Sequence, residues 1–108
     1  MPTSDYADQE GNVLSLRQSL SAGTIAKIGE APAGMASSLD DAWRRRSEML
    51  FERLTVRWEI AGLPLTEQAM LLGRYRMADS DTQQWVRETI ALHVERHIPE
   101  LSAPGSAR

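Results

Sequence analysis

Cysteine is absent from the 108 residues, which excludes disulfide bridges, thiol nucleophiles and cysteine-ligated metal sites together. No apolar run approaches the ~18 residues that a membrane-spanning helix needs. The first residues also lack the basic-then-apolar order of a signal peptide. These features predict a cytoplasmic protein that makes no contact with a membrane.

An excess of basic residues is also lacking, because 12 lysines and arginines face 15 acids and give a net charge of −3. The chain therefore lacks the overall positive charge that is typical of nucleic-acid-binding proteins. The charge is uneven, however. Residues 1–41 hold two basic residues against six acids, a balance of −4, whereas residues 42–78 hold seven arginines against four acids, a balance of +3. A basic middle segment therefore follows an acidic beginning.

Large apolar residues are scarce in residues 1–38, which predicts a flexible or partly helical N-terminal segment without a core of its own. From Trp43 to Ala61 the apolar residues recur at steps of three and four, which predicts a long helix from about 39 to 61. Similar periodicity predicts two shorter helices, at about 66–78 and 80–97. We therefore expect an all-α fold, a small three-helix bundle over residues 39–98 with a long first helix, followed by a disordered tail at 99–108.

Three helices with one apolar stripe each make a thin core, and the long first helix is expected to project beyond the other two. Its apolar side chains would then be partly uncovered, which is typical of a partner surface. Tryptophan and arginine are also enriched in interface hot spots. The sequence thus predicts a non-catalytic regulator, adaptor or chaperone that binds a protein partner and forms a homodimer. The expected contact residues are Trp43, Arg44, Arg45, Arg46, Leu50 and Trp58.

An alternative arises at residues 53–60, where RLTVRWEI also alternates between apolar and polar residues, as a strand does. A short strand followed by two helices, the second reading SDTQQWVRETIALHVERH, resembles the ribbon-helix-helix DNA-binding domains. The resemblance implies a dimeric transcriptional repressor whose paired strands enter the major groove. Arg53, Thr55 and Arg57 would then read bases, and the start of the last helix would hold phosphate. Gly62 and Pro64 depart from the family pattern, because they lengthen the connection after the strand.

Candidate chemistry is sparse. His93 and His97 lie four residues apart and could share one metal ion on a helix, but a metal site needs further ligands that this helix does not supply. The simpler interpretation is two partly buried histidines beside the apolar stripe. The serines and threonines form no recognisable nucleophile motif, and a bundle of this size could hardly enclose a substrate pocket of about 300 Å³. We therefore expect no enzyme activity, no cofactor, no metal and no small-molecule substrate.

Overall fold

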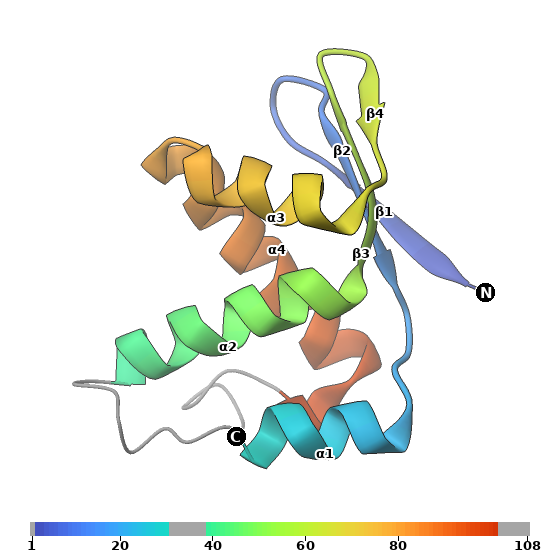
Figure 1. Cartoon of the computed structure of the whole chain (residues 1–108), viewed down its shortest axis with the longest axis vertical. Coiled ribbons are helices and arrows are strands. Elements are labelled where there is room, and N and C mark those ends of the chain that lie inside the picture. Colours follow the sequence, from blue (N-terminus) through green and yellow to red (C-terminus); the bar gives the residue numbers. More distant parts are fainter. Residues whose placement is uncertain (1, 31–38, 102–108) are drawn as a thin grey trace.

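The computed structural model of the chain describes residues 2–30 and 39–101. The elements follow in the order β1 (Thr3–Ala7), β2 (Val13–Arg17), α1 (Ala22–Glu30), α2 (Leu39–Leu54), β3 (Thr55–Ile60), β4 (Leu63–Leu65), α3 (Gln68–Met77), α4 (Ser80–His97) and the short 3-10 helix η2 (Pro99–Leu101). The strands form one antiparallel sheet in the order β1-β2-β3-β4, and the helices lie on one side of it (Figure 1).

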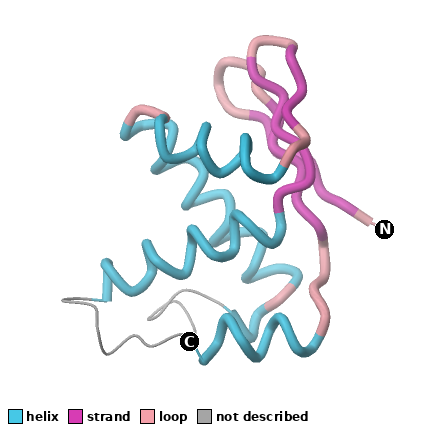
Figure 2. Tube along the Cα trace, viewed as in Figure 1, coloured by secondary structure: helices cyan, strands magenta, loops and turns pink. Residues whose placement is uncertain are grey.

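The expectation of an all-α bundle is wrong, because the chain combines a four-stranded sheet with helices (Figure 2). The N-terminal segment supplies two of these strands. A tight loop joins them, in which Gly11 has a φ of +84° and the Asp8 carboxylate accepts hydrogen bonds from the backbone N–H groups of Glu10 and Asn12. Leu14 and Leu16 on β2 are fully buried. The core therefore extends beyond residues 39–98.

The long helix expected at 39–61 ends at Leu54, and the chain continues directly into β3. Residues 55–60 fit both the helical and the strand period, and β2 decides between them by pairing with β3 in antiparallel register. Leu16 lies opposite Thr55 and Ser15 opposite Arg57, so Val56 is an extra residue that forms a β-bulge. On its other edge β3 pairs with β4. Both edges are therefore occupied within the chain, unlike those of a ribbon that pairs with a second chain.

The core lies between the helices and one face of the sheet. Trp58 of β3 faces the same side as Leu14, its partner on β2. Phe51 of α2 meets the Trp58 ring edge-on, with centroids 5.8 Å apart, and stacks on Tyr75 of α3 at 5.0 Å. The apolar stripe predicted for the last helix is also buried, and it consists of Val86, Ile90, Val94 and Ile98. Offset and edge-on aromatic pairs add to the stabilisation from burial alone, so α2, α3 and β3 share one aromatic centre.

Candidate functional site

The residues expected to contact a partner are divided between the surface and the core. Trp43 is partly buried against the edge of the core, and Arg44 and Arg45 are exposed. Arg46 is half-buried. The other two lie inside: Leu50 is 0 % exposed and Trp58 2 % exposed, so they pack the core and are not accessible to a partner.

A hollow of about 350 Å³, which we call the basic hollow, lies between α2 and α4. Trp43 and Arg44 line it from α2, and Arg87 and Glu88 are among the residues that line it from α4. The Glu88 carboxylate accepts a hydrogen bond of 3.0 Å from the Gln84 side chain. Among the described residues, the lining thus combines an indole ring with two guanidinium groups and one carboxylate. Such a surface suits an acidic partner with some apolar character.

A second hollow of about 400 Å³, which we call the acidic hollow, adjoins the start of α4. Trp85 lies beside four carboxylates, two from the β1–β2 loop and two from the start of α4: Asp8, Glu10, Asp79 and Asp81. Asp79 caps α4 by accepting a 2.8 Å hydrogen bond from the Thr82 backbone N–H. The hydrogen bonds from Thr82 hold the pKa of the Asp79 carboxyl below its usual value. The Asp79 carboxyl is thus ionised at neutral pH, and the four acidic side chains make this surface acidic.

The two hollows adjoin along α4. Asp81 and Trp85 line the acidic hollow, and Glu88 lines the basic one. Their spacing of four and three residues places all three on one stripe of the helix. Sequence reasoning missed both hollows as sites, because each draws its residues from elements far apart in the chain. The uneven charge of the sequence was the available signal.

The three residues that the ribbon-helix-helix resemblance would make base readers do not share one face. Arg53 belongs to the last turn of α2, and Thr55 is buried on the helix side of the sheet. Arg57 lies opposite Ser15 on the outer face and forms an ion pair of 2.7 Å with Glu59. The bulge at Val56 and the burial of Thr55 therefore break the row that a groove-reading ribbon needs.

His93 and His97 do come together, with ring centroids 4.7 Å apart, but His93 has other partners. Its Nε2 lies 2.7 Å from the Arg17 carbonyl oxygen and its Nδ1 2.7 Å from the Tyr6 hydroxyl. Burial lowers the pKa of His93, partly offset by its hydrogen bond to the Arg17 carbonyl, so the ring is neutral at pH 7. Within residues 2–30 and 39–101, no group of three or more His, Asp or Glu side chains is placed to hold a metal ion.

One further charged contact joins two helices. Glu48 of α2 accepts two 3.0 Å hydrogen bonds from the Arg76 guanidinium of α3, which lower the pKa of the Glu48 carboxyl. The described groups with shifted pKa values thus lie at separate structural contacts: Glu48 and Arg76 between helices, Asp79 at a cap and His93 in the core. They do not gather in one cleft, as a catalytic set does.

Comparison with known proteins adds no relative: no family model, no curated protein and no solved structure matches this chain. Among the helices that the structure describes, none has the length and apolar character required to cross a bilayer.

Proposed function

We propose that this chain acts by binding another protein, without catalysis, and that its simplest partner is a second copy of itself. The observation that supports this is the pair of oppositely charged hollows side by side along α4. A two-fold axis over this face would place the basic hollow of each copy against the acidic hollow of the other. Closed two-fold dimers are the commonest homo-oligomers, and such an interface uses the same patch twice.

The side chains present fit this role. Trp43 and Trp85 are both partly buried, one beside each hollow, and offer apolar area next to charge. Leu92, farther along the same face of α4, is exposed. Tryptophan and arginine at the centre of an interface contribute most of the binding energy, while complementary charges set orientation and association rate. Regulators, adaptors and chaperones all fit a binding role of this kind.

A charge-swap experiment tests the proposed interface. In the Arg87→Glu variant, a carboxylate would lie opposite the acidic hollow of the other copy. In the Asp81→Arg variant, a guanidinium would lie opposite the basic hollow of the other copy. Each variant alone is expected to dissociate, because both contacts of a two-fold interface become repulsive. An equimolar mixture of the two is expected to form a heterodimer, since the altered residues then attract each other across one contact and the other contact is native.

Sedimentation velocity over a range of concentrations measures these outcomes. Arg57→Glu is the matched control, because Arg57 lies on the outer face of the sheet and outside both hollows. Trp43→Ala is expected to weaken association at unchanged helix content. A wild-type chain that stays monomeric at the highest concentration and low salt would refute self-association, as would a mixture of the two variants that fails to associate.

A further inference from the structure

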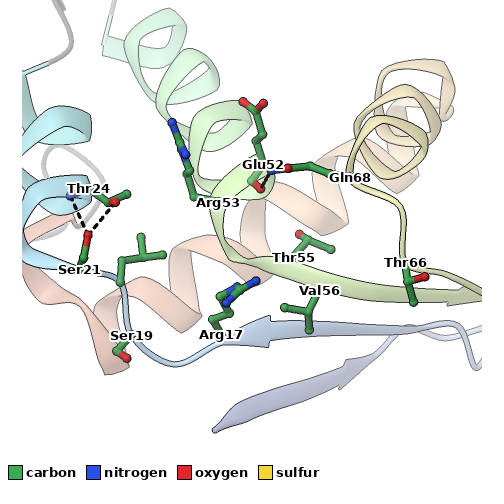
Figure 3. A pocket seen from close by; sticks show the side chains of 11 residues that line it. Arg17, Ser19, Ser21, Thr24, Glu52, Arg53, Thr55, Val56, Thr66 and Gln68 are labelled. Carbon is green, nitrogen blue, oxygen red and sulfur yellow. Dashed lines mark hydrogen bonds between the residues drawn. The ribbon is translucent and has the colours of Figure 1, made fainter. Parts of the chain in front are cut away.

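Another hollow lies away from α4, and no sequence motif points to it. It has a volume of about 760 Å³ and lies where the end of β2, the start of α1, the end of α2 and the start of β3 meet (Figure 3). A second hollow of about 610 Å³ shares Ser21, Thr24, Glu52 and Arg53 with it, so the two form one cleft. Clefts of this size accommodate small molecules of nucleotide dimensions.

The charge of this cleft is opposite to that of the whole chain. Among the residues whose side chains the structure describes, Arg17 and Arg53 line the first hollow, Lys27 lines the second, and Glu52 is the one acidic residue that lines either. These three cations and one anion have a balance of +2, whereas the whole chain carries −3. A phosphate monoester carries about −1.5 to −2 at neutral pH and matches this balance better than a single carboxylate does.

Two helices begin at this cleft. Ser21 precedes α1, where its hydroxyl accepts a 3.2 Å hydrogen bond from the Thr24 backbone N–H, and Gln68 is the first residue of α3. Both ends line the cleft. The N-terminus of a helix carries partial positive charge and favours anions. The Gln68 side chain also donates a 2.8 Å hydrogen bond to the Glu52 carbonyl oxygen, which ties the start of α3 to the end of α2 and stiffens this wall.

The decisive group is Thr55. Thr55 lines the cleft, the residue is 7 % exposed, and its buried hydroxyl has no hydrogen-bond partner among the described residues. Figure 3 shows Thr55 at the start of β3, with Arg17 on one side of it and Thr66 on the other. An unpartnered buried hydroxyl costs free energy that a ligand atom can recover. The bulge at Val56 sets the local course of β3, and bulges often aim side chains at functional sites.

From these observations we infer that the cleft binds a phosphate monoester on a nucleotide-sized molecule. Arg17 supplies a charge-assisted hydrogen bond to the phosphate beside Thr55, whose hydroxyl donates a further one. Arg53, which points away from Thr55 in the free chain (Figure 3), turns toward the phosphate and supplies another. Leu20 and Val56 provide apolar area for the body of the ligand. The site is independent of the proposed dimer interface, because it draws on α1, α3 and the α2–β3 junction and not on α4.

Titration calorimetry at low salt tests the inference with three probes: adenosine 5′-monophosphate, adenosine and inorganic phosphate. The nucleotide is expected to bind most tightly, inorganic phosphate more weakly and adenosine not measurably, because the phosphate is the recognised group. If adenosine binds as well as the nucleotide, or none of the three binds, the inference is wrong.

Thr55→Val separates binding from folding. Valine keeps the shape of threonine and removes only the unpartnered hydroxyl, so the free protein is expected to be as stable or more so. Nucleotide binding is nevertheless expected to weaken about tenfold, as does binding after the loss of one hydrogen bond to a charged group. Unchanged binding in this variant would remove Thr55 from the site and overturn the assignment.

Arg53→Gln is expected to weaken nucleotide binding at least tenfold, by the loss of a charge-assisted hydrogen bond. Arg57→Gln, four residues later on the outer face of the sheet, is the matched control and is expected to leave binding unchanged. Equal losses in both variants would indicate diffuse electrostatic attraction and would also overturn the proposal. Because the dimer interface lies elsewhere, these measurements are independent of the oligomeric state.

Discussion

The Tyr6 hydroxyl donates a hydrogen bond of 2.7 Å to Nδ1 of His93, across 87 positions of the chain. The direction of this hydrogen bond follows from the contact that the other ring nitrogen makes. Nε2 lies 2.7 Å from the Arg17 carbonyl oxygen, which can only accept, so Nε2 carries the proton and Nδ1 of the neutral ring is the acceptor. One buried imidazole thereby connects β1, the end of β2 and α4, and both of its nitrogens are satisfied.

This arrangement predicts a specific pH dependence of stability. Burial lowers the pKa of His93 below the ordinary 6.5 in the folded chain, with smaller contributions in the same direction from His97 and Arg96 and an opposing one from the Arg17 carbonyl. As pH falls through 6.5, the unfolded chain binds a proton at this position before the folded chain does. The free energy of unfolding therefore decreases with falling pH, until the folded pKa is reached.

Urea denaturation at several pH values between 7.5 and 5, a range that spans the ordinary histidine pKa of 6.5, measures this effect. In His93→Gln the part of the slope that belongs to His93 is expected to vanish, at the cost of lower stability at pH 7.5. The remaining titrating groups are shared by both proteins, and the lowered pKa of Glu48 confines its effect to more acidic conditions. Parallel pH profiles for the two proteins would contradict the assigned role of His93.

The burial of Leu50 gives a second prediction. Leu50 is fully buried, so Leu50→Ala is expected to destabilise the fold by about 2–5 kcal/mol through lost burial and a cavity. Leu63→Ala is the matched control: this leucine of β4 is 73 % exposed. Its truncation is expected to change stability by no more than about 0.5 kcal/mol. Thermal or urea unfolding compares the two, and a similar small loss in both would mean that Leu50 is not a core residue.

The β3–β4 turn gives a third prediction. Ala61 has a φ of +52° and Gly62 a φ of +80°, so both central residues adopt the left-handed region, as a type I′ hairpin turn requires. Alanine is strained there, whereas asparagine tolerates this conformation. Ala61→Asn is therefore expected to raise the free energy of unfolding by about 0.5–1 kcal/mol.

Gly62→Ala changes the neighbouring position in the opposite direction, from a residue that tolerates the left-handed region to one that is strained there. It is expected to lower the free energy of unfolding by about 1–2 kcal/mol. Nothing lies within 4 Å of the added methyl group, so the cost would come from the backbone alone. Urea unfolding measures both variants. An Ala61→Asn protein that is less stable than the wild type would show that the turn does not gain from asparagine.

The sequence predicted the helices most accurately where the apolar residues follow the helical period alone. The stripe of α4 is buried as expected, and α2 follows the predicted spacing through Leu54. It failed at β1 and β2, because five-residue strands with serine, aspartate and arginine carry little periodic signal. The surfaces were harder to find. The expected Trp43 and Arg44 do line a hollow, but Arg87 and the acidic hollow join them only through the packing of α4.

The sequence by itself placed Leu54 and Trp58 on an apolar face under both the helical and the strand pattern, whereas packing decided that Trp58 lies in the core and not on a partner surface. The sequence also determined the uneven charge along the chain. Only the tertiary structure decided that residues 55–60 form a strand. This strand is stabilised by pairing with β2, which is distant in the sequence, and with β4, which follows it. The same pairing buried Thr55 and turned Arg57 outward. Local periodicity cannot encode such choices, because they depend on which backbone groups find partners after the chain has folded.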